Sequence, residues 1–334
     1  MVEAWVESPF QLLGALEAHA EGLLGESLDV VPRAGLEPLA VTVAELTRLG
    51  LPAGSTVRPA VAAPARGART LAVGDVFSGR VQQLLAGRPP HRVVLLDDGR
   101  ATLRMLQALS RRDVPLVRPH APASALRSAL ARVTLARLKH LARAGRLDVV
   151  TALDVPPELV DAARRVGVQV HRHSFGWLRS QPSDVPAAGP GPVVLGSSMV
   201  ANGLIHAEPY LEWVRSIAAN SPTGPVTYRA HRREDERTLR PLRAAGVDVR
   251  SGAVPVEVSL RGMALGQQVV TLPTTAASTL RMLAPQARVS EYAVPETWWQ
   301  AGVSDVTRQR LVPEVSSGPA APWRRLGRLS AVAS

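Results

Sequence analysis

The 334-residue sequence has no cysteine, and aromatic residues make up only 4% of it. The lack of cysteine excludes disulfides, zinc-thiolate sites and thiol nucleophiles, and it fits a reducing compartment. No apolar run approaches the roughly 18 residues that are needed to cross a bilayer, and the start of the chain, Met1–Ala4, lacks the basic and apolar regions of a signal peptide. We therefore expect a cytoplasmic protein.

Lysine is also nearly absent. Lys139 is the only one, so arginine supplies almost all of the positive charge behind the net charge of +11. The arginines are spread along the chain and are not gathered with aromatic residues into a surface on which bases could stack. We therefore expect no nucleic-acid partner, and the sign of the charge fits an anionic substrate or an anionic membrane surface.

The remaining composition, 46% hydrophobic and 20% charged, is that of a globular protein, and the length suits two domains of roughly 150 residues each. Four prolines and two glycines in the segment 181–192 disfavour regular structure and predict a linker. We expect an N-terminal domain over residues 1–180, a C-terminal domain over 193–315, and a tail or closing segment over 316–334.

Short apolar runs alternate with helical patterns along both halves of the chain. The predicted strands are 4–6, 28–31, 70–73, 93–96, 149–151 and 168–170 in the first half, and 193–195, 226–229 and 269–272 in the second. Helices are predicted from the Ser8-Pro9 start signal onward and over 77–85, 159–166 and 208–219. This alternation predicts an α/β fold of two Rossmann-like domains with parallel sheets and a ligand cleft between them.

The first candidate site is Asp97-Asp98-Gly99, at the end of the apolar strand 93–96. Two adjacent carboxylates repel each other, so at least one is a candidate for acid/base chemistry. Gly99 allows a sharp turn close to a ligand, and the carboxyl ends of strands are where open α/β sheets bind substrates. The alternative is a solvated Asp-Gly turn.

The second candidate is the segment Tyr228–Glu234, at the end of a predicted strand, in which three arginines lie within three residues of His231. Arginine and protonated histidine neutralise phosphate, and an imidazole can deliver a proton to a leaving group. The alternative is a basic loop that opens an exposed helix, with Glu234 and Asp235 in its first turn.

The third candidate is the segment Pro273–Thr279, at a strand-to-helix junction. Its hydroxyl residues Thr274, Thr275, Ser278 and Thr279 would add side-chain donors to the free backbone amides of a helix start, which predicts a phosphate cradle. The alternative is simple N-capping by Thr274 or Thr275.

Two further turns, Gly74-Asp75 and Gly196-Ser197, follow predicted strands and could equally be plain connections. Neither matches the dinucleotide pattern G-x-G-x-x-G, so a nicotinamide cofactor has little support. There is no His-rich metal spacing either, and we expect no metal site.

The segment from Ser124 to Arg143 predicts a helix with apolar residues on one side and Arg132, Lys139 and Arg143 on the other. Such a helix could lie on the anionic inner face of the cell membrane. The alternative is a core-facing helix with a solvated basic face.

Taken in order, these motifs resemble those of bacterial sialyltransferases of the lipooligosaccharide sialyltransferase and polysialyltransferase-like groups, whose shared motifs are D/E-D/E-G, His-Pro and a Ser/Thr-rich segment. The matches are Asp97–Gly99, His231-Arg232 and Pro273–Thr279, with supporting likeness in Ser8–Leu13, Gly74-Asp75 and Leu195–Ser198. The resemblance covers roughly residues 2 to 300. Arg232 replaces the proline of the second motif, and threonines largely replace the paired serines of the third, which leaves the donor open among acidic sugars carried on CMP.

The resemblance implies a GT-B fold with a central cleft, a CMP-sugar donor held mainly by the C-terminal domain, and inverting, metal-independent transfer of sialic acid or a related acidic sugar to an acceptor glycan. It implies Asp98 as the general base, with Asp97 as its support, and His231 as the group that meets the CMP phosphate. The further substrate-binding residues that it implies are Ser8, Gln11, Gly74, Asp75, Gly99, Gly196, Ser197, Arg232, Pro273, Thr274, Thr275, Ser278 and Thr279. The alternatives are a GT-B enzyme that uses a UDP- or GDP-sugar, and a non-catalytic protein that binds an anionic glycan or nucleotide.

Overall fold

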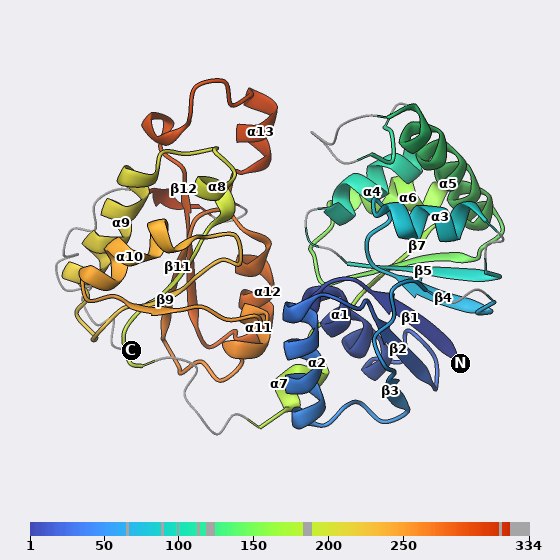
Figure 1. Cartoon of the computed structure of the whole chain (residues 1–334), viewed down its shortest axis with the longest axis horizontal. Coiled ribbons are helices and arrows are strands. Elements are labelled where there is room, and N and C mark those ends of the chain that lie inside the picture. Colours follow the sequence, from blue (N-terminus) through green and yellow to red (C-terminus); the bar gives the residue numbers. More distant parts are fainter. Residues whose placement is uncertain are drawn as a thin grey trace, which may run out of the picture. The chain divides into compact units, whose positions relative to one another are not determined.

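The structure, a computed structural model, describes residues 1–64, 67–87, 90–97, 99, 101–111, 114–117, 124–182, 189–313 and 316–320. Residues 183–188 of the expected linker and 321–334 of the expected tail lie outside the described residues. The chain divides into two compact units, Met1–Pro182 with Ala253–Pro255, and Ser183–Gly252 with Val256–Ser334. Each unit has its own parallel sheet with helices (Figure 1), which confirms the predicted α/β class and is compatible with two Rossmann-like domains.

The sheet of the first unit has seven strands in the order β3-β2-β1-β4-β5-β6-β7, and every pair is parallel. Its strands are β1 (Val2–Val6), β2 (Leu28–Pro32), β3 (Ser55–Val57), β4 (Thr70–Val73), β5 (Arg92–Leu96), β6 (Leu147–Thr151) and β7 (Gln169–Arg172). The strand order reverses between β1 and β4. That reversal creates a switch point, at whose carboxyl edge doubly wound sheets bind ligands.

The helices of the first unit cover both faces of its sheet. Figure 1 shows α3 to α6 on one face, and α1, α2 and α7 on the other. They are α1 (Pro9–Ala20), α2 (Glu37–Leu49), α3 (Gly79–Ala86), α4 (Ala101–Ser110), α5 (Ala125–Arg143), α6 (Pro157–Arg165) and α7 (Gly176–Ser180). The predicted start of α1 is confirmed, because the Ser8 hydroxyl accepts a hydrogen bond from the Gln11 backbone N at 3.2 Å and Pro9 occupies the first turn.

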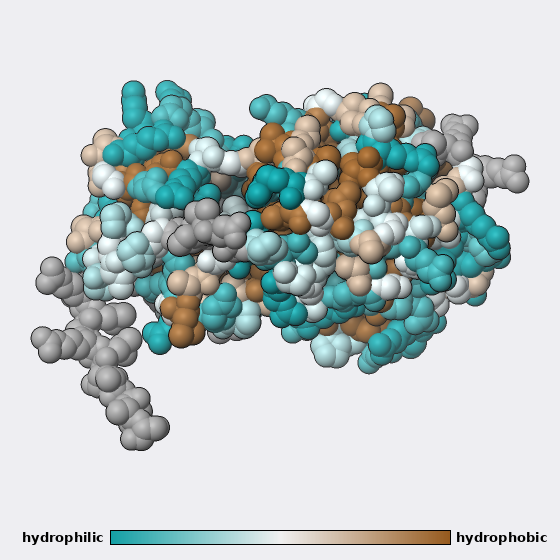
Figure 2. All heavy atoms as spheres, turned by 90° about the horizontal axis from the view of Figure 1, so that it is seen from below, coloured by the Kyte–Doolittle hydropathy of each residue, from teal (hydrophilic) through white to brown (hydrophobic). Residues whose placement is uncertain are grey.

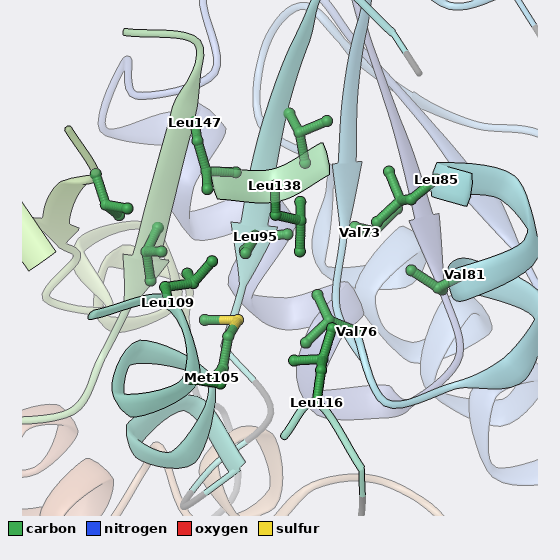
Figure 3. Packing of buried hydrophobic residues seen from close by; sticks show 14 of the residues in the cluster. Val73, Val76, Val81, Leu85, Leu95, Met105, Leu109, Leu116, Leu138 and Leu147 are labelled. Carbon is green, nitrogen blue, oxygen red and sulfur yellow. The ribbon is translucent and has the colours of Figure 1, made fainter. Parts of the chain in front are cut away.

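Buried leucines, valines and a methionine join the sheet of the first unit to α3, α4 and α5 (Figure 3). The residues labelled there are Val73, Val76, Val81, Leu85, Leu95, Met105, Leu109, Leu116, Leu138 and Leu147. Because helices cover both faces, the strands read as continuous apolar runs and not as alternating ones. Burying one such leucine contributes about 1.5–3 kcal/mol, so this packing holds the strand ends in place.

The sheet of the second unit has six parallel strands in the order β10-β9-β8-β11-β12-β13. They are β8 (Val193–Leu195), β9 (Thr227–Arg229), β10 (Asp248–Arg250), β11 (Gln268–Thr271), β12 (Arg288–Ala293) and β13 (Ser316–Pro319). The order reverses between β8 and β11. Strand β13 falls within the expected tail, and it pairs with β12 at the edge of this sheet.

The helices of the second unit are α8 (Ser198–Ala201), α9 (Ala207–Ala219), α10 (Glu236–Ala244), α11 (Val256–Ser259), α12 (Thr275–Leu283) and α13 (Asp305–Arg310), with a 3-10 helix η1 (Glu296–Trp298). Its core holds an aromatic cluster in which the Trp213 ring lies 6.0 Å from Tyr210, 5.9 Å from Tyr292 and 6.2 Å from Trp298. The few aromatic residues of this chain thus include a group that packs one core.

Helix α5 is the helix that the sequence placed either on a membrane or against the core. It buries Leu138 and Leu141 and exposes Leu126 and Val133, so it packs on the core, and a membrane contact stays a prediction. In the described part of the chain, no helix is both long and apolar enough to span a membrane. Figure 2 shows hydrophilic residues over much of one face, with apolar residues exposed between them.

Candidate functional site

Three of the predicted site segments follow neighbouring strands of the second unit, β8, β9 and β11. Leu195 of β8 lies opposite Arg229 of β9, and Val194 of β8 lies opposite Val270 of β11. The turns that follow these parallel strands therefore leave the same edge of the sheet, at its switch point. We call residues 196–198, 230–234 and 272–275 the second switch edge.

Gly196 lets the first two of these turns approach each other closely. Its backbone N donates to the Arg229 carbonyl oxygen at 2.7 Å. A Cβ at this position would lie 2.6 Å from the His231 backbone N and 2.9 Å from that same carbonyl oxygen. Only glycine fits here, because both neighbours are main-chain atoms that cannot rotate away.

The side chain of Glu234, which one interpretation of the sequence placed in the first turn of a helix, instead holds the loop that carries His231. Glu234 accepts hydrogen bonds from the His231 backbone N at 2.6 Å and from the Tyr228 hydroxyl at 2.5 Å. Tyr228 in turn shares a 2.7 Å hydrogen bond with the hydroxyl of Tyr210, and both tyrosines are fully buried. Placing Glu234 in the first helical turn was wrong: α10 begins at Glu236 with Asp235 as its N-cap, and Glu234 turns back toward the sheet.

Burial raises the pKa of Glu234 to about 7, although hydrogen bonds from Tyr228, His231 and Ser197 oppose the increase. Between pH 4.5 and 7 the folded state therefore keeps a proton on Glu234, whereas the unfolded state, with a pKa near 4.5, has released it. Stability from this group is present below pH 4.5 and is lost as the pH rises to 7, by at most about 3 kcal/mol.

Glu234→Gln is expected to remove this loss. An amide can still accept from the His231 N–H and can donate to the Tyr228 hydroxyl, so these two hydrogen bonds survive. Urea unfolding at a series of pH values should show the variant gaining stability over the wild type between pH 4.5 and 7, with a constant difference above that range. Parallel stability curves would contradict a Glu234 proton in the folded state.

His231 itself is half-buried, and its ring is held in one tautomer. The Arg233 backbone N donates to His231 Nδ1 at 3.1 Å, so in the neutral ring the proton sits on Nε2. Burial, then the charges of Arg232 and Arg233, lower the pKa of His231 to about 4. Near neutral pH the ring is therefore an uncharged hydrogen-bond donor, and the exposed Arg232 and Arg233 supply the positive charge beside it.

The third segment forms the N-terminus of α12. The Thr274 side chain caps the helix by accepting from the Ala276 N at 3.3 Å, while its own backbone N donates to Glu291 at 3.2 Å. Glu291 is fully buried and lies 3.4 Å from the guanidinium of Arg281. The capping alternative is thus confirmed for Thr274, and the anchoring to Glu291 sets the direction in which the helix start faces.

The hydroxyl residues of α12 differ in what they can offer to a ligand. Thr275 and Ser278 are partly exposed, whereas Pro273 and Thr279 are buried. The Thr279 hydroxyl donates to Glu257 at 2.6 Å, because its position in the helix turns it toward α11. We therefore leave Thr279 out of the ligand-binding set that we propose.

In the first unit, the structure brings the segments around Ser8 and Gly74 together at the switch point between β1 and β4. Gln11 accepts from the Glu7 backbone N at 2.8 Å, and a Cβ on Gly74 would lie 2.0 Å from the Gln11 side chain. Asp75 accepts from the Phe77 N at 2.9 Å. These contacts build a close-packed turn at this edge.

Asp97 is buried at the end of β5, and both of its oxygens are occupied. One oxygen accepts from the Gly99 N at 2.8 Å and the Thr102 hydroxyl at 2.6 Å. The other accepts from the Thr151 hydroxyl at 2.7 Å and the Ala152 N at 3.1 Å. Burial raises the pKa of Asp97, and these four hydrogen bonds oppose the increase.

These contacts make Asp97 an anchor for the turn that follows it. Gly99 adopts a left-handed conformation with φ of 68°, as the sharp turn requires. Asp98 lies between these two residues and outside the described part of the chain.

Among the described residues, no group of three or more histidine, aspartate or glutamate side chains could hold a metal ion. No protein-family model and no curated protein matches the sequence.

Proposed function

We propose that the chain is an inverting, metal-independent glycosyltransferase that transfers sialic acid or a related acidic sugar from a CMP-sugar to an acceptor glycan. The motif resemblance suggests the reaction. The observation that carries the proposal is the meeting of His231, Ser197 and the N-terminus of α12 at one switch edge.

The second switch edge offers several donors to one phosphate group. His231 presents Nε2–H, and Thr275 places its hydroxyl in the first turn of α12. The backbone N–H groups of Thr274, Ala276 and Ala277 already donate within the protein. The partial positive charge of a helix N-terminus and the cations Arg232 and Arg233 favour an anion there. Ser197 and Ser278 are partly exposed next to these groups.

In the proposed reaction, an acceptor hydroxyl oxygen attacks the anomeric carbon from the face opposite the phosphate. The bond from that carbon to the phosphate oxygen breaks, and CMP leaves with the electron pair as a stable anion. His231 therefore needs only to donate a hydrogen bond to the departing phosphate, which a neutral ring can do. The acceptor proton goes to Asp98, whose turn is anchored by Asp97.

The proposal includes a GT-B arrangement, with the donor on the second unit and the acceptor on the first. Ser8, Gln11, Gly74, Asp75 and Gly99 would then shape the acceptor side. We place the reaction in the cytoplasm, at or near the inner face of the membrane.

A thermal-shift panel of CMP, UMP, GMP and UDP tests the donor assignment. We expect CMP to raise the melting temperature, since a ligand at 100 times its Kd stabilises by about 2.7 kcal/mol. His231→Ala should lose most of this shift, whereas His140→Ala, an exposed histidine of the first unit, should retain it. A shift with UDP and none with CMP would mean that the donor is a UDP-sugar and not a CMP-sugar. No shift with any nucleotide would refute the proposed donor site.

A further inference from the structure

A second site lies in the first unit, where α4, α5 and α6 end. The ends of these helices form an open pocket of about 550 Å³ lined by five basic residues, Arg111, Lys139, Arg143, Arg164 and Arg165. Crossover helices run opposite to their strands, so this pocket lies at the amino edge of the sheet, away from the carboxyl edge that holds Asp97. It is therefore separate from the acid motif.

Helices α5 and α6 do not need these cations to satisfy their last carbonyl groups. Helix α5 is closed by its own backbone, with the Arg146 N donating to the Leu141 oxygen at 2.9 Å. Helix α6 closes in the same way, from the Val168 N to the Ala163 oxygen at 3.0 Å. Such backbone closure is the usual way in which a helix end is capped, so Arg143, Arg164 and Arg165 are not needed to cap α5 or α6.

No aspartate or glutamate lines the pocket within the described part of the chain. Arg164 lies 3.8 Å from Asp161, but both side chains are more than half exposed, and such pairs contribute little. Lys139 donates to the Arg111 carbonyl oxygen at 2.7 Å, which ties α5 to the end of α4 and keeps its charge at the pocket.

The walls of the pocket are fixed by the core. Leu109 and Leu138, each within a few residues of a basic lining residue, are buried and pack into the cluster of Figure 3. This packing fixes the backbone from which the exposed or partly exposed basic side chains project into the pocket.

We propose that this pocket binds a ligand that carries two or more phosphate groups. Four of its five cations are arginines, whose planar guanidinium groups match pairs of phosphate oxygens. One phosphate can contact only some of these arginines, whereas a diphosphate or bisphosphate spreads its charge over several of them. The volume is within the range of small-ligand sites, about 300–1,000 Å³. The ligand is either a soluble diphosphate or the headgroup of a phospholipid, and the inference does not depend on the proposed transferase reaction.

Two probes separate these sources. Inorganic pyrophosphate is titrated by calorimetry, and sedimentation measures binding to phosphatidylcholine vesicles with and without cardiolipin, whose headgroup carries two phosphates. The test variant is Arg143→Gln/Arg165→Gln, and the matched control is Arg127→Gln/Arg132→Gln, which removes the same charge from exposed positions in the first half of α5. All four positions are exposed, so melting temperatures should stay near that of the wild type.

We expect the test variant to bind its probe at least about tenfold more weakly, because it loses charge-assisted hydrogen bonds to the phosphate oxygens. The control should bind as the wild type does. Loss of pyrophosphate binding alone identifies a soluble ligand, and loss of cardiolipin binding alone identifies a lipid headgroup. The proposal is overturned if neither probe binds, or if both variants weaken binding equally. It is also overturned if His231→Ala abolishes pyrophosphate binding while the test variant retains it.

Discussion

Gly196→Ala is expected to destabilise the second unit by about 3 kcal/mol and to abolish the thermal shift with CMP. The added Cβ would lie 2.6 Å from the His231 N, 2.9 Å from the Arg229 oxygen and 2.2 Å from Glu234. The carboxylate can rotate, but the two main-chain atoms can move only if the strands β8 and β9 separate. Relief of the clash thus displaces the loop that carries His231. Urea unfolding measures the first effect, and the nucleotide panel measures the second.

Gly79→Ala is the matched control for this change. Gly79 is the first residue of α3, and nothing lies within 4 Å of a Cβ built there. Alanine is the better helix former, so we expect stability to be equal or higher by up to about 1 kcal/mol. If Gly196→Ala unfolded like this control and kept its CMP shift, the close approach of the two turns would not be what positions His231.

The local parts of the fold were predictable from sequence. Apolar runs such as Val193–Leu195 became central strands because both faces of each sheet are covered. Helix starts carry their own signal within a few residues, as the caps Ser8 and Thr274 show. The order of strands then places the predicted turns at common edges, because parallel strands end together.

The edge strands β3, β10 and β13 were not predicted, because pairing and not composition makes them strands, whereas the edge strand β7 was predicted. Strand β10, Asp248–Arg250, is polar and short, and β13 contains Gly318 and ends at Pro319. The partners of the site residues were missed for a related reason. Glu291 lies 17 residues from Thr274 and Glu257 lies 22 residues from Thr279, and no local pattern marks a buried carboxylate that anchors a distant turn.

Asp98→Asn is expected to lower the rate of sugar transfer by about 100-fold to 10,000-fold while leaving stability and the CMP shift unchanged. The range is what a positioned general base contributes, and an amide cannot take the acceptor proton. The measurement is the rate of CMP release in the presence of an acceptor glycan, together with urea unfolding and the nucleotide panel. Loss of the CMP shift would instead make Asp98 part of the donor site.

The neighbouring carboxylate should respond in the opposite way. Each oxygen of Asp97 accepts from one backbone N–H, of Gly99 or of Ala152, and a backbone N–H can only donate. Either orientation of the amide in Asp97→Asn therefore places an NH₂ group against a main-chain donor, at a cost of about 1–3 kcal/mol for each buried group left unpaired. We expect this variant to lose that stability and to transfer more slowly because the turn before Gly99 is no longer held. These measurements distinguish the two adjacent aspartates. Replacing the anchor lowers the free energy of unfolding, whereas replacing the base lowers the rate of sugar transfer alone. A stable Asp97→Asn with a large loss of rate would exchange the two roles.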